Sequence, residues 1–199
     1  MVMIDISEVE ELRKEILNCT KCELSSTRNH VIFGEGNINA EVIIIGEAPG
    51  RDEDIQGRPF VGKSGQLLDK ILAACGFTRN EHVFISNIVK CRPPNNRVPN
   101  PQEAATCMPW LSKQIELIDP KIIILLGATA LKYILGNEHK ITRDHGNWFS
   151  WKNRHVMPVF HPSALLRDPS LKRPEWEDFK KIVYKYRDLI DPNHYSPHI

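Results

Sequence analysis

Four short apolar runs, most of them rich in β-branched residues, divide this chain at intervals that an amphipathic helix can bridge. Such runs are typical of strands buried on both faces of a parallel sheet. They cover Val42–Ile45, Val83–Val89, Lys121–Gly127 and Arg154–Phe160. Segments with helical periodicity cover Ser7–Asn18, Ser64–Cys75, about Gln102 to Ile118, Ala128–Leu135 and about Glu175 to Ile190. This alternation predicts an α/β fold, a three-layer α/β/α sandwich around a four-stranded parallel sheet.

Local signals indicate where some of these elements begin and end. Ser7 and Glu10 have the spacing of a capping box at the start of the first helix. Gly76 stands where the second helix should stop. Pro158, inside the fourth apolar run, favours an edge position or the end of that strand. Thr20–Asn39 is predicted to be irregular.

Length and charge are those of an ordinary globular protein. We expect one domain over residues 1–199, with a flexible tail at about 192–199. The formal net charge of +1 excludes a polybasic tail but allows a local basic groove. Met1–Glu11 is acidic and has no apolar run of the kind found in a cleavable signal. No run approaches the roughly 20 apolar residues of a membrane helix, so we expect a cytoplasmic protein with no membrane contact.

A glycine-rich segment follows the first predicted strand. Five glycines fall within twenty positions: Gly46, Gly50, Gly57, Gly62 and Gly65. A segment of this kind needs positive φ angles or a close approach of its backbone to another group. In an open α/β sheet, ligands bind beyond the carboxyl ends of the strands, where this segment should lie. The alternative is an ordinary polar connection in which the carboxylates of Asp52–Asp54 are solvated.

Polar and aromatic residues near the ends of three predicted strands form a candidate site. Glu47 follows the first strand, Asn87 lies near the end of the second, and His161 follows the fourth. Phe60 belongs to the glycine-rich segment. An amide in an apolar strand needs its hydrogen bonds met, and one carboxamide offers both a donor and an acceptor. The alternatives are a structural asparagine, a core phenylalanine and a histidine at the surface or in the core.

Five cysteines, an odd number, argue against a disulfide framework. Cys19 and Cys22 form a C-x2-C pair at a predicted helix end, whereas Cys91 and Cys107 flank a proline-rich loop. Four thiolates suit a [4Fe–4S] cluster or a structural zinc ion, and the spacing does not choose between them. The remaining alternative is four unrelated buried cysteines. Cys75 lies on the apolar face of a helix and is expected in the core.

The sequence of the glycine-rich segment resembles a motif of a known family. G-E-A-P-G followed by G-R-P-F-V-G-K-S-G-Q-L-L is similar to the first motif of the family 4 uracil-DNA glycosylases, the iron–sulfur branch of that superfamily. Asn87–Pro94, the cysteine set and His161–Arg167 agree with this resemblance, which extends from Cys19 to about Arg167. It implies a [4Fe–4S] cluster held by Cys19, Cys22, Cys91 and Cys107, and we expect that cluster to be structural.

The resemblance also implies an activity. It indicates hydrolysis of the N-glycosidic bond of deoxyuridine in single-stranded or mispaired DNA, which releases uracil and leaves an abasic site without a lyase step. An enzyme that acts on a base takes it out of the stack. Asn87 would then read N3–H and O4 of uracil, Phe60 would cover a face of the base, and His161 would donate a hydrogen bond to O2 as the base leaves.

The motif leaves more than one candidate for the group that positions water. Ala48 stands in the substrate-binding segment where the best-known relatives carry an aspartate. Glu47 and Glu53 are therefore the candidates for the catalytic carboxylate. Glu53 is also a candidate to crowd C5 of the base and so exclude the methyl group of thymine.

Contacts to DNA are expected from the rim of the site. Lys63 and Ser64 begin a helix, whose N-terminal N–H groups favour a phosphate. Further candidates lie on the proline-rich loop and after His161, namely Arg92, Asn95, Asn96, Arg97, Ser163 and Arg167. Leu165, Leu166 or Arg167 would enter the space that the flipped nucleotide leaves.

Two other hypotheses remain. One is a glycosylase that also accepts hypoxanthine or alkylated pyrimidines, and the other is a non-catalytic iron–sulfur module that binds nucleic acid. A branch that traps the sugar covalently through a histidine-bearing insertion is set aside, because Arg51–Arg58 contains no histidine. We expect a nucleoid-associated monomer, and a sliding clamp is a further candidate partner.

Overall fold

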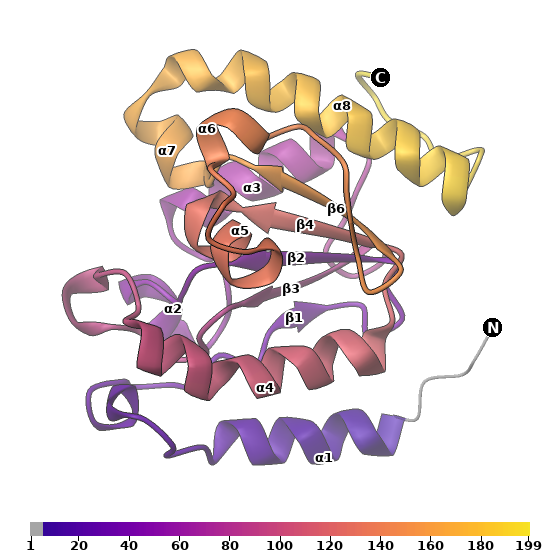
Figure 1. Ribbon diagram of the computed structural model, residues 1–199. Coiled ribbons are helices and arrows are strands. Elements are labelled where there is room, and N and C mark those ends of the chain that lie inside the picture. The colour runs from indigo at the N-terminus through magenta and orange to yellow at the C-terminus, as the bar shows by residue number, and fades with distance from the viewer. Residues whose placement is uncertain (1–5) are drawn as a thin grey trace.

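The computed structural model describes residues 6–199, and its sheet is larger than predicted. Six strands lie in the order β1-β3-β2-β4-β6-β5 (Figure 1). They are β1 (Glu35–Gly36), β2 (Val42–Gly46), β3 (Val83–Asn87), β4 (Ile122–Leu126), β5 (Phe149–Trp151) and β6 (Arg154–Val159). The four predicted strands, β3, β2, β4 and β6, pair in parallel. Antiparallel β1 and β5 extend the two edges. The sheet is therefore mixed and has six strands, so the prediction of a purely parallel sheet of four strands was incomplete.

The two additional strands are short, which explains why no apolar run in the sequence predicted them. β1 has two residues and β5 has three. A two-residue turn joins β5 to β6, with Lys152 and Asn153 both at positive φ, as tight hairpins require. Because of this hairpin, β6 is not an edge strand. Pro158 stands one residue before the end of β6 and beyond the residues that pair with β5, which agrees with its predicted place at the strand's end.

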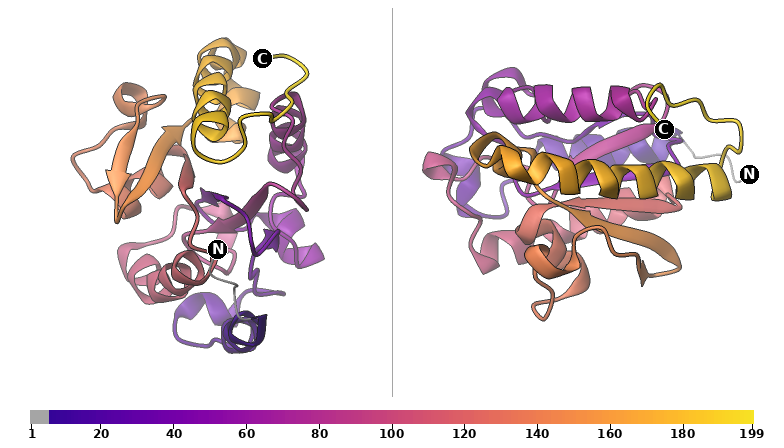
Figure 2. Two further views of the ribbon diagram at one scale, coloured as in Figure 1. Left: turned by 90° about the vertical axis from the view of Figure 1, so that its right-hand side faces the viewer. Right: turned by 90° about the horizontal axis from the view of Figure 1, so that it is seen from above.

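Helices cover both faces of the sheet. α4 (Pro101–Ile118) and α5 (Gly127–Leu135) lie on one face, with α1 (Ile6–Leu17) packed outside α4, whereas α3 (Lys63–Ala74) and α8 (Lys172–Leu189) lie on the other (Figures 1 and 2). Ile43 and Ile45 of β2 belong to the core under α4, and Val42 and Ile44 belong to the core under α3 and α8. Alternate residues of a central strand are thus buried on opposite faces, and three layers result.

The predicted helices agree with these bounds to within three residues at each end. α1 begins at Ile6, so Ser7 lies in its first turn. Shorter elements complete the fold: α2 (Arg51–Gln56), α6 (Ile141–Asp144), α7 (Pro162–Arg167), and the 3₁₀ turns η1 (Glu23–Ser26), η2 (Pro94–Asn96) and η3 (Pro169–Leu171). Across residues 6–199, no helix is both long and apolar enough to cross a membrane.

The segment after α8 packs back onto the helical layer of α3. Nε2 of His194 lies 2.8 Å from the carbonyl oxygen of Cys75, and its ring stacks on Phe77. The hydroxyl of Ser196 donates to the carbonyl of Ala74 at 3.0 Å. These contacts differ from the flexible tail expected at about 192–199. The sequence does not reveal them, because their partners lie more than a hundred positions earlier in the chain.

Candidate functional site

The carboxyl ends of the parallel strands meet at the end of the molecule that carries α2 and α7 (Figure 1). In the register of β2 and β3, Gly46 lies opposite Asn87. β6 ends at Val159, two residues before His161. Glu47, Asn87 and His161 therefore lie at one edge of the sheet, as the parallel topology predicts.

Asn87 and Phe60 meet above Gly46. A Cβ atom at Gly46 would lie 2.5 Å from Oδ1 of Asn87 and 2.6 Å from Cζ of Phe60. Asn87 is 2 % exposed, and no group within residues 6–199 donates a hydrogen bond to its buried Oδ1 atom. A buried acceptor without a donor costs about 1–3 kcal/mol. A ligand that brings its own N–H to this point would remove that cost.

His161 is a neutral hydrogen-bond donor. The backbone N–H of Ser163 donates to Nδ1 of His161 at 3.1 Å, at the start of α7. Because Nδ1 accepts, the hydrogen-bond network assigns the ring proton to Nε2. Burial, together with repulsion from Arg167, lowers the pKa of His161 to about 4, while Glu53 opposes this shift. The ring lies 5.8 Å from that of Phe60, centre to centre, and is tilted by 35°.

The carboxylate of Glu53 organises the glycine-rich segment. Its Oε1 atom accepts the N–H groups of Val61 and Gly62 at 2.8 and 2.9 Å, and its Oε2 atom accepts that of Gly50 at 3.1 Å. The bond to Gly50 caps α2, an element that the sequence did not predict. Both carboxylate oxygens of Glu53 thus accept hydrogen bonds from the backbone. The sequence did contain one signal for α2, because Gly50 and Glu53 have the spacing of a capping box.

The other polar residues of this segment divide into two groups. Glu47 is half-buried and accepts a hydrogen bond from the hydroxyl of Thr129 on α5, and Ala48 beside it is also half-buried. Asp54 is buried, and its carboxylate accepts two hydrogen bonds from Asn29, through the backbone and side-chain nitrogens. Asp54 therefore fixes α2 to the preceding loop and is neither solvated nor part of the sheet edge.

Lys90 supports Asn87 through the backbone carbonyl of Asn87. The sequence analysis did not identify this residue. Its ammonium group donates to the Asn87 carbonyl at 2.9 Å, and to Ser86 Oγ and Gln114 Oε1 at 2.6 Å each. Burial lowers the pKa of Lys90 to about 8. Its place at the end of an apolar run gave no sign of this network, because Gln114 comes from α4.

Glu175 supports the His161 segment in a similar way. This carboxyl group is 2 % exposed and accepts the N–H of Phe160 at 2.9 Å through Oε2. Its Oε1 atom is buried without a partner in the described chain. Burial raises the pKa of Glu175 to about 8, and nearby Asp178 adds to the rise. The neutral form therefore prevails at pH 7.

The expected rim residues are only partly available. Lys63 is exposed at the first position of α3, and Ser64 is half-buried behind it. Leu165 is 1 % exposed, because α7 turns it into the protein, whereas Leu166 is 45 % exposed. Leu165 is thus unsuited to contact DNA, and Arg167 is exposed beside Leu166. α7 is too short for its inner face to be predicted from periodicity.

On the proline-rich loop, Arg92 donates to Oδ1 of Asn96 at 2.7 Å. Asn95 and Asn96 both have positive φ. Arg97 is bound to the buried carboxylate of Glu103 at 2.6 Å, and this bond lowers the pKa of Glu103. Arg92 and the two asparagines therefore remain candidates for contact with a ligand, while Arg97 anchors the loop to α4.

Four cysteines surround one small cavity. Its lining comprises Ile16, Cys19, Lys21, Cys22, Arg28, Val31, Lys90, Cys91, Thr106, Cys107 and Trp110. Three N–H groups point at sulfur atoms: Arg28 donates to Cys91 at 3.2 Å, the Lys90 backbone to Cys107 at 3.3 Å, and the Trp110 indole to Cys19 at 3.3 Å. Donors directed at sulfur stabilise thiolate charge.

The four thiols line this cavity together, as the ligands of one shared metal centre would. Burial raises the pKa of Cys91 to about 11, so a cationic centre is needed to hold it as a thiolate. Cys75 is fully buried at the C-cap of α3, as expected of a core residue.

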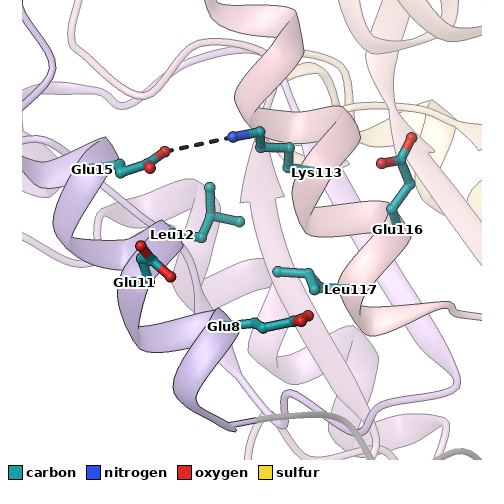
Figure 3. A pocket seen from close by; sticks show the side chains of 7 residues that line it. All are labelled: Glu8, Glu11, Leu12, Glu15, Lys113, Glu116 and Leu117. Carbon is teal, nitrogen blue, oxygen red and sulfur yellow. Dashed lines mark ion pairs between the residues drawn. The ribbon is translucent and has the colours of Figure 1, made fainter.

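A separate groove lies between α1 and α4 (Figure 3). Leu12 and Leu117 lie in it, and Lys113 forms an ion pair with Glu15 at 3.5 Å. Its other lining residues are Glu8, Glu11 and Glu116. This excess of carboxylates repels phosphate, so the groove is not suited to bind DNA.

Comparison with known proteins gives consistent matches. A family model described as the uracil DNA glycosylase superfamily matches residues 33–183. A type-4 uracil-DNA glycosylase from Thermotoga maritima is 46 % identical over 177 residues, 87 % of this chain and 92 % of that protein. One from Sulfurisphaera tokodaii is 42 % identical over 200 residues, 96 % and 89 % of the two chains. One from Archaeoglobus fulgidus is 41 % identical over 185 residues, 89 % and 92 %.

Proposed function

The chain belongs to the uracil DNA glycosylase superfamily, and we propose that it excises uracil from DNA, as the names of its type-4 relatives indicate. The reaction would hydrolyse the N-glycosidic bond of deoxyuridine and leave an abasic site, without a lyase step. One observation carries the proposal: the amide oxygen of Asn87, which has no donor among residues 6–199, lies beside the ring of Phe60, at the edge that also holds neutral His161.

Asn87 supplies the selectivity for uracil. Its unpartnered Oδ1 atom accepts N3–H of the base, and its amide N–H donates to O4. Cytosine presents the reverse pattern, an acceptor at N3 and a donor at position 4, and would oppose both groups. Phe60 covers one face of the flipped base. Lys90 holds the backbone of Asn87 in place through its carbonyl.

His161 stabilises the departing base. Its Nε2–H group donates to O2 of uracil, where negative charge grows as the glycosidic bond breaks. Ser163 keeps the ring in this tautomer by donating to Nδ1. The low pKa of His161 matters because a neutral ring stays a donor without taking up a proton from solution.

Glu47 is the better candidate to orient the attacking water. Among the described residues, its carboxylate accepts one hydrogen bond, from Thr129, whereas both oxygens of Glu53 accept hydrogen bonds from backbone N–H groups. Ala48 offers no polar side chain for this task. We therefore assign the water to Glu47 and the shape of the pocket wall, including the exclusion of a C5 methyl group, to Glu53.

The four cysteines around the small cavity would hold a [4Fe–4S] cluster. Cys19 and Cys22 follow α1, Cys91 follows β3, and Cys107 lies on α4. The cluster, when bound, supplies a cross-link between these segments and takes no part in the bond cleavage. By fixing the residues after β3, it also fixes the strand end that carries Asn87.

DNA would run along the rim that surrounds this edge. Lys63 and the N-terminal N–H groups of α3 offer a site for a phosphate, and Arg92 and Arg167 are further candidates for phosphate contacts. Exposed Leu166 takes the role of the apolar wedge, since Leu165 is buried. Because its substrate would be DNA, we expect the protein to associate with the nucleoid.

A uracil-bearing oligonucleotide tests the proposal. Purified protein should release free uracil, and alkali should then cleave the strand at that position only. An intact strand with no free uracil would instead indicate a module that only binds nucleic acid. Release of hypoxanthine as fast as uracil would indicate the broader glycosylase, which the amide of Asn87 disfavours.

A further inference from the structure

Phe60 adopts a backbone conformation that bulky residues rarely take. Its φ angle is +52°, in the left-handed region. Such a conformation is strained and persists only where the surroundings impose it. Gly65 contributes by leaving space, because a Cβ atom there would collide with the Phe60 carbonyl. Empty space alone does not hold a strained residue, so the bonds on either side of Phe60 decide its position.

Two side chains of opposite charge bind the backbone on the two sides of Phe60. Glu53 accepts the N–H groups of the next two residues, as described above. Arg79 donates through Nη1 to the carbonyl of Pro59 at 2.8 Å and through Nη2 to the carbonyl of Phe60 at 2.6 Å. Four consecutive residues are therefore held by a carboxylate on one side and a guanidinium on the other.

Arg79 is itself fixed in place. Its Nε atom donates to Asp69 on α3 at 2.7 Å, and Nη1 lies 3.7 Å from Glu35 on β1. The side chain is only 13 % exposed, and it lies in the turn between α3 and β3, outside every motif noted in the sequence. The planar, five-donor fork of arginine binds two carbonyls and a carboxylate in one fixed geometry, whereas the ammonium group of a lysine is a point charge without this planar arrangement.

We propose that Arg79 is a positioning residue for uracil excision, which acts by holding Phe60 in its left-handed conformation. Without the guanidinium, two carbonyls lose their donors and Phe60 is free to relax to negative φ. Its ring would then leave the contact with Asn87 above Gly46. The proposal rests on the proposed function, because Phe60 covers the base only if uracil binds at this edge.

Arg79→Met tests this role, since methionine keeps an unbranched apolar stem and removes all donors. Arg58→Met is the matched control. This substitution removes the same charge next to the same segment. Arg58 pairs with the same Glu35, at 2.7 Å, but it binds no carbonyl of the Phe60 segment. We expect the single-turnover rate of uracil excision to fall on the order of 10²-fold in Arg79→Met, the cost of a 1 Å misplacement. Arg58→Met should stay within about twofold of the parent, as expected of an exposed ion pair.

A second readout separates positioning from general destabilisation. In a Phe60→Ala background, Arg79→Met should cause no further loss of rate, because the two residues act as one unit. Amide hydrogen exchange at Val61 and Gly62 should accelerate in Arg79→Met and not in Arg58→Met. A parental rate in Arg79→Met, or a loss that persists in full without Phe60, overturns the proposal. If the parent itself releases no uracil, the proposed function fails, and hydrogen exchange alone then decides whether Arg79 holds this segment.

Discussion

A Cβ atom added to Gly46 would lie 2.5 Å from the side-chain oxygen of Asn87. The same atom would lie 2.6 Å from the ring of Phe60. Asn87 is 2 % exposed and Phe60 is 6 % exposed, so neither side chain has room to retreat. The glycine at the end of β2 is therefore a condition for the amide and the ring to meet.

Gly46→Ala should damage the site more than the fold. The added methyl group overpacks a filled region, which costs about 1–3 kcal/mol in the free energy of unfolding. Displacement of Asn87 or Phe60 by about 1 Å should lower the single-turnover rate on the order of 10²-fold. Denaturant unfolding and the rate of uracil release measure the two effects. A folded variant with the parental rate would contradict the packing described here.

His161→Ala should raise the barrier to excision by about 2–4 kcal/mol, the range for loss of one donor to a developing anion. The affinity for DNA should change little, because the donor acts on the departing base. Single-turnover kinetics and a binding isotherm on the same oligonucleotide separate the two effects. If binding collapses while the chemistry survives, His161 is a DNA contact instead.

The pH dependence gives an independent check on His161. Its pKa in the folded protein, about 4, lies below the ordinary value of 6.5. Between these values the ring stays neutral, so the excision rate should show no inflection near pH 6.5 that depends on His161. Arg167→Met removes a repelling charge and should raise the pKa of His161, measurable by NMR titration of the ring. An unshifted titration near pH 6.5 in the parent would contradict the enclosed, neutral ring.

Stability should depend on pH through Glu175. Burial raises its pKa to about 8 from about 4.5, so the folded protein holds a proton that the unfolded chain releases. The stabilisation is present in full below pH 4.5 and is lost as the pH rises through 8. Glu175→Gln mimics the neutral form. Between pH 5.5 and 8.5, its free energy of unfolding should fall by about 1–3 kcal/mol less than that of the parent. Urea unfolding at both pH values measures this, and equal losses would show that Glu175 is charged at neutral pH.

Removal of single cysteines tests the metal centre. Protein purified without air should be brown and contain about four irons per chain. Cys91→Ser and Cys107→Ser should lose iron and folded yield, because each removes a ligand and loosens the segment that it joins. Cys75→Ala is the matched control, since Cys75 is buried at the C-cap of α3 and does not line the cavity of the other four. Stoichiometric zinc in place of iron would contradict the assignment.

The strand-end residues could be predicted because topology alone brings them together. Apolar runs located β2, β3, β4 and β6, and parallel strands have their carboxyl ends at one edge. Glu47, Asn87 and His161 then followed from their positions in the chain. β1 and β5 were missed because strands of two and three residues carry no periodic pattern.

The supporting contacts could not be predicted, because they depend on the path of loops and on partners from distant elements. Lys90 bonds to Gln114, 24 positions away, and Glu175 bonds to Phe160, 15 positions away. The burial of Leu165 depends on how α7 packs on α3. Arg79, in the turn after α3, bonds to the carbonyl of Phe60, which lies 19 positions earlier in the chain.

Base recognition by Asn87 is the central claim, and Asn87→Asp tests it most directly. An ionised aspartate only accepts hydrogen bonds, so it keeps the contact to N3–H of uracil but opposes O4 with like charge. The buried mismatch should lower the rate of uracil excision on the order of 10⁴-fold, as in sites built to bind a specific polar group. Weak release of cytosine at lower pH agrees with the same logic, because a shared proton would let the carboxyl group face N3.

The decisive measurement is the single-turnover rate of uracil release by Asn87→Asp and by the parent, with equal iron content and equal unfolding midpoints. We predict that release by the variant is nearly abolished while the parent remains active on the same oligonucleotide. If a folded, iron-loaded Asn87→Asp protein releases uracil at the parental rate, Asn87 does not read the base.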